Sequence, residues 1–571
     1  MCANIFNKYT TVNLYVELRN YMMNKHDTRE RFIQQYMTAV EANMTIDQFA
    51  DYLGIQASSV TRYKNKIAQE TGIKLPTMVK DNGGDEVEMP ATLVGEDTYK
   101  KVSLENDPPK RIVITAAQNA TPIHDEFFNS ILQYCKIMDA ELMVIPYRYK
   151  NPTSIYQSLQ EKEEWWDKRL EPYLVEDDIT VHRELRVMGH VKMQPTATNP
   201  LSGFDSYTGR MSAIFGHPKI QLKTIPTPSK SLPKILSTTG AITRENYTDT
   251  KAGRKGEFHH SLAAIVVEID NDGVFHQRHI HADELDGSFY DLDSHFSTKG
   301  RSTGHRVAGL ITGDSHAEFI DPAVKAATYT NSDSLCSVLR PLYSVVHDVE
   351  DFYRRNHHHR GDPFLAYGKH HLGRNNVEEG LQVTANFLDE ISDDSRLTVV
   401  IKANHDEALD RWLREADPKY DPENARFYHY MMYNMFSNMK MTETGYSTVD
   451  PFVFWCHNPD RQQGLSKKDF VKFLKRDESF TIEGIEVGFH GDKGPNGGRG
   501  NIKAFTKIGP KTVIGHSHSP GIEEGVYQVG LSARMDLEYV SGPSSWLQTH
   551  CIIYPDGKRT LVNVINGKWK R

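Results

Sequence analysis

The chain has 571 residues, of which 38% are hydrophobic and 25% charged, a balance typical of a soluble protein with about three or four domains. Its longest apolar runs, such as Ala263–Val267 and Phe452–Cys456, span only about five residues, whereas a membrane-spanning helix needs about 20, so no membrane partner is expected. The N-terminus has no basic segment followed by an apolar stretch, and the five cysteines have neither zinc-knuckle spacing nor the pattern of a disulfide framework. We therefore expect a cytoplasmic protein. The net charge of −8 argues against a polyanion binder that uses its whole surface, but a local basic groove is compatible with it.

Residues 1–76 are expected to form a helical domain that contains a helix-turn-helix. Thr45 can cap the first helix, and Gly54 supplies the permissive backbone of the turn. The apolar positions that would pack between the two helices are Ile46, Phe49, Ala50, Leu53, Val60 and Ile67. The outward side chains of the second helix include Ser58, Ser59, Arg62 and Lys64. Such donors suit base edges and phosphates, so these residues are predicted to bind DNA. The alternative is that the unit binds another protein.

Residues 77–109 are poor in large apolar side chains and are expected to form a linker. An α/β domain should follow over residues 110–300. It would open with a strand at Arg111–Ala116, a helix at Asp125–Met138 and a strand at Ala140–Pro146. The domain contains neither a phosphate-binding loop nor a nucleophile elbow, so its role is not predicted.

Histidine is unusually frequent, with 26 residues in the chain and 14 of them between His259 and His371. Histidine is the commonest metal ligand, so the spacing must decide between metal binding and structural roles. His279 and His281 would share one strand face, but without acidic partners we favour a structural role for them. The run His357–Arg360 is expected to be a solvated loop that could face a substrate.

After residue 306, short apolar strands are repeatedly followed by side chains that can bind metals. The strands are expected at Val307–Thr312, Leu342–Val346, Leu397–Ile401, Ile485–Phe489 and Thr512–Ile514. In the same order, the groups that follow them are Asp314-Ser315-His316, His347-Asp348-Val349-Glu350-Asp351, Asn404-His405-Asp406, His490-Gly491 and Gly515-His516-Ser517-His518. Loops at the carboxyl ends of strands share one crevice in α/β folds, so these groups are expected to meet.

The residue types fit a pair of divalent cations. A carboxylate can bridge two ions while imidazoles and an amide oxygen complete their coordination. Two ions about 4 Å apart can hold a phosphoryl oxygen and activate a bridging water. The absence of thiols from the set argues against a structural zinc site.

These motifs resemble, in type and order, those of the calcineurin-like metallophosphoesterase superfamily over residues 301–571. The resemblance implies a C-terminal β-sandwich flanked by helices. It also implies a metal-ligand set of Asp314, His316, Asp348, Asn404, His490, His516 and His518. Asp348 would bridge the two ions, and His405 would contact the phosphate or protonate the leaving oxygen, oriented by Asp351.

Two departures from the family pattern lie beside the ligands. His347 and Ala403 stand where the family has glycine, and these replacements leave the predicted ligands intact. Glu350 is the competing carboxylate, but it lies two positions further from the strand end than Asp348 does.

A nuclease would explain why a helix-turn-helix precedes the catalytic domain. The segment 491–511 adds five basic residues against one acid, and of these Lys493 and Arg499 are predicted to contact a phosphate backbone. An ordinary surface loop is the alternative. The overall layout is also similar to that of the pre-early nucleases with which certain tailed phages degrade host DNA in the bacterial cytoplasm, and this implies Mn²⁺ as the cofactor.

Other readings stay open at this point. Mg²⁺, Fe²⁺ and Zn²⁺ are alternative cofactors, and a homo-oligomer is an open alternative to a monomer. The competing function is a DNA-binding regulator whose phosphoesterase domain acts on a small molecule or is vestigial.

Overall fold

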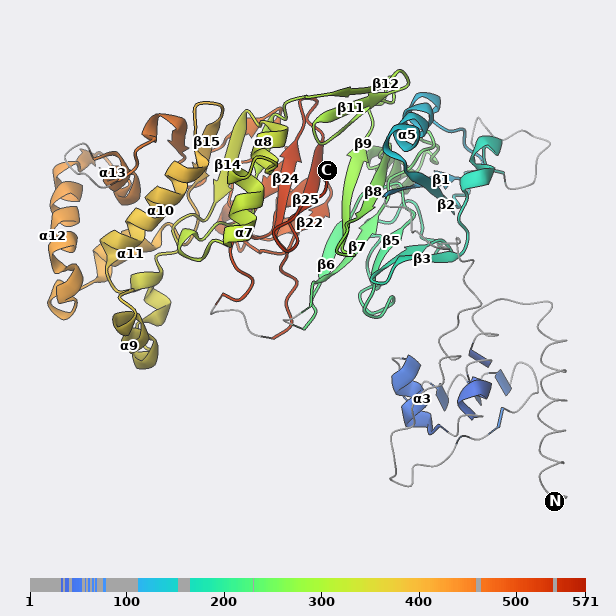
Figure 1. Ribbon diagram of the computed structural model, residues 1–571, viewed down its shortest axis with the longest axis horizontal. Coiled ribbons are helices and arrows are strands. Elements are labelled where there is room, and N and C mark those ends of the chain that lie inside the picture. The colour runs from blue at the N-terminus through green and yellow to red at the C-terminus, as the bar shows by residue number, and fades with distance from the viewer. Residues whose placement is uncertain are drawn as a thin grey trace. The chain divides into compact units, whose positions relative to one another are not determined.

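The computed structural model describes residues 111–151, 165–228, 231–458, 464–537 and 542–571, together with scattered positions between 32 and 78. The chain divides into two compact units, Met1–Lys100 and Lys101–Arg571 (Figure 1). Helices and several β-sheets are both present, so the expected α/β class is confirmed. Among the described residues, none of the helices is long and apolar enough to cross a membrane.

The N-terminal unit contains the first predicted helix, α3 (Ile46–Leu53). The Thr45 hydroxyl accepts a hydrogen bond from the Gln48 backbone N–H at 3.2 Å, and the Gln48 side chain accepts one from the Thr45 N–H at 2.9 Å. This reciprocal pair is a capping box, which confirms the predicted cap. Phe49, Ala50, Val60 and Ile67 are buried together, as the helix-turn-helix pattern predicts.

The predicted DNA-contacting face lies mostly outside the described residues, as do Ser58, Ser59 and Arg62. The described positions between 57 and 68 are helical. Lys64 is half-buried: its ammonium donates to the Pro76 carbonyl at 2.9 Å and lies 5.6 Å from the centre of the Tyr36 ring. DNA contact by this unit stays a prediction.

The larger unit is built around two sheets that pack face to face. A six-stranded sheet has the order β18 (Val471–Phe473), β15 (Leu397–Ile401), β14 (Tyr343–His347), β13 (Gly309–Ile311), β24 (Thr549–Ile553) and β25 (Arg559–Asn563). A ten-stranded sheet has the order β19 (Thr481–Ile482), β20 (Ile485–Glu486), β21 (Thr512–Ile514), β23 (Val526–Gln528), β22 (Gly521–Glu523), β6 (Leu222–Ile225), β7 (Lys234–Thr238), β5 (Ser212–Phe215), β4 (Leu185–Met188) and β3 (Asp178–His182).

Alternation along the strands of the six-stranded sheet fills two separate cores. Val345 and Val399 join the core shared with the ten-stranded sheet. Their neighbours Val346 and Val400 point the other way and pack against helices. A strand buried on both faces reads as a continuous apolar run, which is what the sequence shows at β14 and β15.

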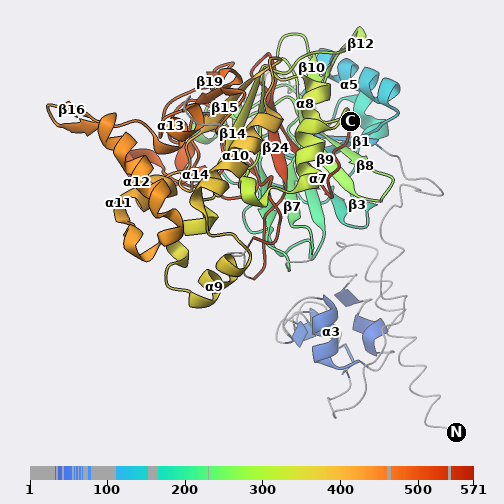
Figure 2. The same cartoon turned by 60° about the vertical axis from the view of Figure 1, so that its left-hand side comes forward.

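Helices cover the outer face of the six-stranded sheet (Figures 1 and 2). The helices that contribute to this core are α7 (Pro322–Lys325), α8 (Leu335–Leu339), α10 (Val377–Ile391), α11 (Ala408–Glu415), α12 (Pro422–Ser437) and α13 (Pro451–His457). Their neighbour α9 (Pro363–His371) leaves Phe364 and Tyr367 exposed.

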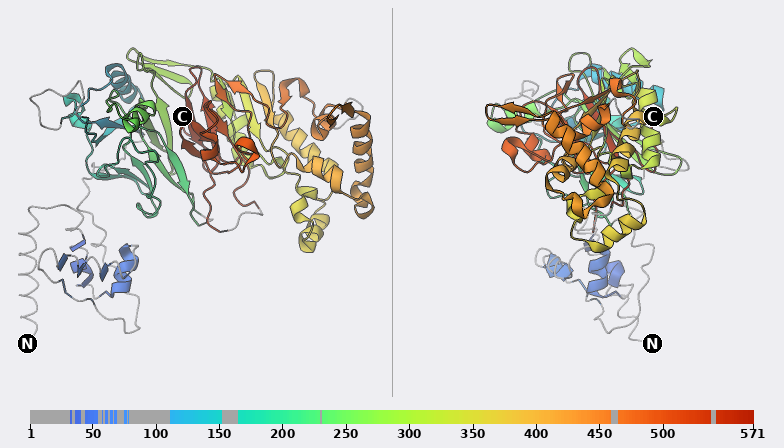
Figure 3. Two further views of the ribbon diagram at one scale, coloured as in Figure 1. Left: turned by 180° about the vertical axis from the view of Figure 1, so that it is seen from behind. Right: turned by 90° about the vertical axis from the view of Figure 1, so that its left-hand side faces the viewer.

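A four-stranded sheet packs on the β3–β5 end of the ten-stranded sheet (Figure 3). Its order is β2 (Glu141–Tyr147), β1 (Arg111–Gln118), β8 (Ala263–Ile269) and β9 (Phe275–His281). Helix α5 (Asp125–Met138) covers its other face, and β1 and β2 are parallel, so the predicted strand–helix–strand opening is confirmed. The remaining elements are α6 (Lys251–Phe258), β10 (Phe289–Asp291), β11 (Ser294–Ser297), β12 (Gly300–Thr303), β16 (Lys440–Thr442), β17 (Gly445–Ser447) and α14 (Ile502–Phe505).

The ten-stranded sheet joins segments from both sides of residue 300. Its central pairing is antiparallel, with Leu222 of β6 opposite Ile522 of β22. Residues 110–300 therefore supply half of a sheet whose other half carries part of the candidate site.

Candidate metal centre

The strand-end groups predicted from the sequence converge at one end of the two packed sheets. Strands β13, β14 and β15 are parallel neighbours in one sheet, and β20 and β21 are parallel neighbours in the facing sheet. Because parallel strands end at the same edge, their following loops meet. The side chains that arrive there from four of these strand ends are Asp314, His316, Asp348, His490 and His518, and all are buried.

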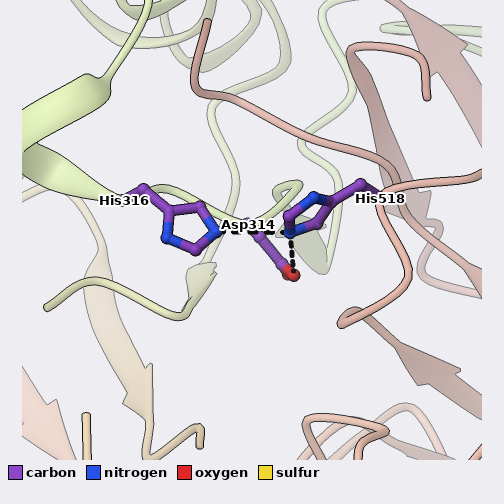
Figure 4. A group of neighbouring side chains, drawn as sticks. All are labelled: Asp314, His316 and His518. Atoms are coloured by element: carbon purple, nitrogen blue, oxygen red, sulfur yellow. Dashed lines mark hydrogen bonds and ion pairs between the residues drawn. The ribbon is translucent and has the colours of Figure 1, made fainter. Parts of the chain in front are cut away.

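One group of ligand atoms comprises Asp314, His316 and His518, all within 4.8 Å of one another (Figure 4). The His518 Nε2 lies 3.1 Å from the Asp314 Oδ2 and 3.2 Å from the His316 Nε2. Two imidazole nitrogens directed at each other beside a carboxylate form a suitable pocket for a divalent cation. This is the first of the two predicted metal sites.

A second group comprises Asp314, His347 and His490, again within 4.8 Å of one another. The His516 ring lies 5.2 Å from the His490 ring, and the His516 backbone N–H donates to the Asp314 carboxylate at 2.9 Å. The Asn404 Oδ1, from the loop after β15, is buried and has no hydrogen-bond partner among the residues that the structure describes.

The Asp348 carboxylate lies between the two groups. Its Oδ2 is 3.7 Å from the His316 Nε2 on one side and 3.8 Å from the His490 Nε2 on the other. A carboxylate in that position can reach a cation on either side, which is the geometry that a bridging ligand requires.

Buried polar atoms without partners show that these residues fit metal ions. Such atoms are normally hydrogen-bonded, because leaving one unsatisfied costs about 1–3 kcal/mol. The atoms here that have no hydrogen-bond partner within the described part of the chain are Asp314 Oδ1, Asp348 Oδ1, Asn404 Oδ1 and both ring nitrogens of His347 and His490. Their concentration at one place fits a site at which cations would complete their coordination.

The protonation states suit the same role. Burial alone would raise the pKa of Asp314, but the facing His490 and His518 lower it, so the carboxylate is ionised. Burial lowers the pKa of His347 to about 4 and that of His490 well below its ordinary value, so both imidazoles are neutral. Ionised carboxylates and neutral imidazoles are the forms that bind metals.

Asp351 contacts two histidines at once. Its Oδ1 accepts from the His316 Nδ1 at 2.9 Å and lies 3.1 Å from the His405 Nδ1. The first contact orients a candidate metal ligand, and the second orients the residue predicted to act on the leaving oxygen. Burial would lower the pKa of His405, but the carboxylates of Asp348 and Asp351 raise it to about 10, so the ring holds its proton.

Several site residues adopt left-handed backbone conformations that residues other than glycine rarely adopt. The φ angles are 44° at His316, 49° at Asp348, 74° at His516 and 57° at His518. Such strain costs about 1–3 kcal/mol per residue and persists where the surrounding structure imposes it, often at functional sites. Gly515 is required for a different reason, since a Cβ there would lie 2.4 Å from the Asp314 Oδ1.

The structure also identifies residues that the motif analysis missed. His347 belongs to the second ligand group, although it was seen only as a replacement for the family's glycine. Asp406 ties two ligand loops together by accepting from the Ala403 N–H at 2.7 Å and the Glu350 N–H at 2.8 Å. His550 accepts from the Gly313 N–H at 3.0 Å and so supports the loop of Asp314.

The strand-end position of His347 was a usable signal, whereas the roles of Asp406 and His550 depend on contacts that no spacing reveals. The competing carboxylate of Glu350 accepts from the Thr384 hydroxyl at 2.6 Å and from the Phe352 N–H at 2.8 Å. It belongs to no ligand group among the described residues. The structural role favoured for His279 and His281 agrees with their hydrogen bonds to the Thr238 carbonyl at 2.8 Å and the Tyr527 hydroxyl at 3.1 Å.

Two cavities adjoin the candidate metal centre. One, of about 350 Å³, is lined by Asp351 and His405 together with Phe319, Tyr353 and part of the His357–His359 turn. The other, of about 1210 Å³, has Asn404 and Lys493 in its wall. The Lys493 side chain is exposed, and its ammonium lies 3.6 Å from the Glu407 carboxylate. The Lys493 backbone forms a β-bridge with Arg499, which is also exposed.

Comparison with curated proteins finds Protein A1 of Escherichia phage T5, which is 35% identical over 470 residues, or 81% of this chain and 83% of the relative. No protein-family model matches the chain, and no solved structure matches it.

Proposed function

This chain belongs to the family of Protein A1 of Escherichia phage T5, and we propose that it is a metal-dependent nuclease that hydrolyses phosphodiester bonds in DNA. The observation that carries the proposal is the position of Asp348 between two buried groups of ligand atoms, beside Asp314 and Asn404 oxygens and His490 nitrogens that have no hydrogen-bond partner among the described residues. The motif resemblance to the metallophosphoesterases and the phage relative both support it. A phage nuclease would act on host DNA in the bacterial cytoplasm.

The residues divide into two ligand sets that share Asp348. The first set would be Asp314, His316, Asp348 and His518, and the second would be Asp348, Asn404, His490 and His516, with His347 as an added ligand. Asp314 also groups with His347 and His490, so its carboxylate lies within reach of both sets. Bound divalent cations would neutralise phosphate charge and lower the pKa of a bound water. Aspartate, asparagine and histidine ligands suit Mn²⁺ as the cofactor, with Fe²⁺, Mg²⁺ and Zn²⁺ as alternatives.

The chain's own acid would be His405. Its Nδ1 is held by Asp351, and its ring lines the 350 Å³ cavity, where the leaving group can be placed. Because the ring holds its proton, it can donate that proton to the departing oxygen. Lys493 and Arg499 are exposed beside the larger groove, where they could contact the phosphate backbone.

The deciding experiment is incubation of purified protein with closed-circular and linear duplex DNA, each with Mn²⁺, with Mg²⁺ or with a chelator. Degradation that requires metal and is lost in Asp348→Ala supports the nuclease. Cleavage of the circular DNA would show that no DNA end is needed. Intact DNA under every metal condition would refute the proposal.

A second candidate is a phosphoesterase that acts on a small molecule. The observation that favours it is the size of the cavity beside His405, about 350 Å³, which suits one small phosphate ester. A chromogenic phosphodiester distinguishes the two: its hydrolysis with DNA left intact supports the small-molecule enzyme. Arg499→Ala should weaken action on DNA alone if the nuclease proposal is right.

A further inference from the structure

A third cavity, of about 570 Å³, lies away from the candidate metal centre and gathers basic side chains from separate elements. Lys511 immediately precedes β21, whereas His516 follows the same strand, so the cavity and the metal centre lie at opposite ends of β21. Lys558 lies in the turn between β24 and β25, and Arg559 is the first residue of β25. No motif in the sequence had marked this combination.

Arg559 is the fixed element of the cavity. It is only 5% exposed, and its Nη1 donates to the carbonyls of Thr512 at 2.9 Å and Gly525 at 2.8 Å. Its guanidinium carbon lies 4.3 Å from the centre of the Tyr527 ring. These contacts engage one nitrogen and one face of the group. The Nε and Nη2 donors make no hydrogen bond with the described part of the chain, although the residue lines the cavity.

Lys511 and Lys558 add positive charge to the cavity, and neither forms an ion pair with a described residue. The Lys511 side chain makes no hydrogen bond or ion pair with any described residue, and the Lys558 ammonium donates to the Ala282 carbonyl. The pKa of Lys511 is lowered by partial burial and by the neighbouring Arg559 and Lys558, and Glu284 opposes part of this shift. Like charges that line one cavity repel, so an anion between them would stabilise the arrangement.

Of the acids that line the cavity, Glu524 pairs with other lysines, whereas Asp556 and Glu284 are exposed. The Glu524 carboxylate pairs with Lys219 at 2.9 Å and Lys255 at 3.6 Å. The Asp556 carboxylate accepts from the Lys558 backbone N–H at 3.0 Å, and Glu284 is exposed. None of them forms an ion pair with Lys511, Lys558 or Arg559 in the described structure.

We propose that Lys511, Lys558 and Arg559 form a binding site for the phosphate group of a nucleotide, separate from the candidate metal centre. A guanidinium with free donors and two flexible ammonium groups is a suitable combination for a phosphate. Phe258, which is 81% exposed at the same cavity, offers a ring on which a base can stack. The phosphate could belong to a free nucleotide or to a nucleic-acid strand, and competition experiments separate these sources.

Pyridoxal 5′-phosphate is a probe suited to this site, because its aldehyde condenses with a lysine amine, with loss of water, while its phosphate occupies an anion site. The full-length protein would be treated with the probe and reduced with borohydride, and the modified lysines would be quantified by peptide mass spectrometry. We expect Lys511 to be modified at a probe concentration at least about tenfold lower than Lys507, because one charge-assisted hydrogen bond is worth about 1.5–3 kcal/mol. Lys507 is a matched control, since it is exposed four residues away and does not line the cavity.

Pyridoxal without the phosphate controls for the intrinsic reactivity of Lys511. If pyridoxal prefers Lys511 as strongly as the phosphorylated probe does, reactivity alone explains the labelling and the proposal is overturned. Protection by inorganic phosphate and deoxyadenosine monophosphate would support a free nucleotide as the ligand. Protection by a duplex oligonucleotide alone would support a nucleic-acid strand.

Surface variants test the site without disturbing its buried arginine. Lys558→Gln should reduce the preference for Lys511 several-fold, whereas Lys507→Gln should leave it unchanged. Labelling of Lys511 that neither competitor nor Lys558→Gln alters would overturn the proposal. Because the readout is the labelled lysine rather than DNA cleavage, the result does not depend on the proposed nuclease activity.

Discussion

Substitution of Asp351 should separate the two roles that its carboxylate has in the structure. Its Oδ1 contacts the His316 and His405 rings at 2.9 and 3.1 Å, and these two contacts lower the pKa of Asp351 against the effect of burial. Asp351→Asn keeps the shape of the side chain but removes its charge. Each contact should then lose part of the about 1.5–3 kcal/mol that a hydrogen bond to a charged group contributes. Metal affinity depends on the His316 contact alone, and we expect it to fall about 10–100-fold, as for other residues that orient metal ligands.

The measurement is titration of the metal-free protein with Mn²⁺ by calorimetry, beside the rate of hydrolysis of a chromogenic phosphodiester. His405→Ala is the matched comparison, because it should reduce the rate while Mn²⁺ binding stays close to that of the wild type. If Asp351→Asn binds Mn²⁺ as tightly as the wild type, the inferred support of His316 is wrong. Full activity in His405→Ala would refute the role given to that histidine.

Three further outcomes are expected from the same structure. Asp348→Ala should abolish hydrolysis and leave fewer than two ions per chain by elemental analysis, since the bridging carboxylate is lost; two retained ions would contradict its assignment. Removal of metal by a chelator should lower the melting temperature, and Mn²⁺ restored at about 100 times its Kd should return about 2.7 kcal/mol of stability. An unchanged melting temperature would mean that the buried atoms without hydrogen-bond partners bind no cation. Thr45→Ala should speed amide hydrogen exchange in Ile46–Leu53, because losing a helix cap costs about 0.5–2 kcal/mol, and unaltered exchange would argue against the capping box.

The local elements and most of the ligands could be predicted because their signals are local. A strand such as Leu397–Ile401 is a continuous apolar run, and its end is marked by the polar residues that follow it. The convergence of five such ends follows from the parallel pairing of neighbouring strands. The same reasoning located α5, whose polar and apolar residues alternate with helical period.

The remaining features depend on residues far apart in the chain. The pairing of Leu222 with Ile522 unites segments 300 residues apart, and neither strand contains a sign of its partner. The support of Gly313 by His550 is of the same kind, because the two positions meet only when β13 and β24 pair. The cluster of Lys511, Lys558 and Arg559 likewise forms only after the sheets have packed.

His347 is an intermediate case, and it shows where the motif comparison misled. A glycine position in a motif suggests that only a small residue fits, so a histidine there reads as a neutral replacement. In the folded chain the side chain is fully buried within reach of Asp314 and His490, and neither of its nitrogens has a hydrogen-bond partner in the described structure. Burying an imidazole with no partner is unfavourable, so a bound cation would account for its placement. Asp314 and His490 belong to the same group of ligand atoms, so such a cation would engage all three side chains.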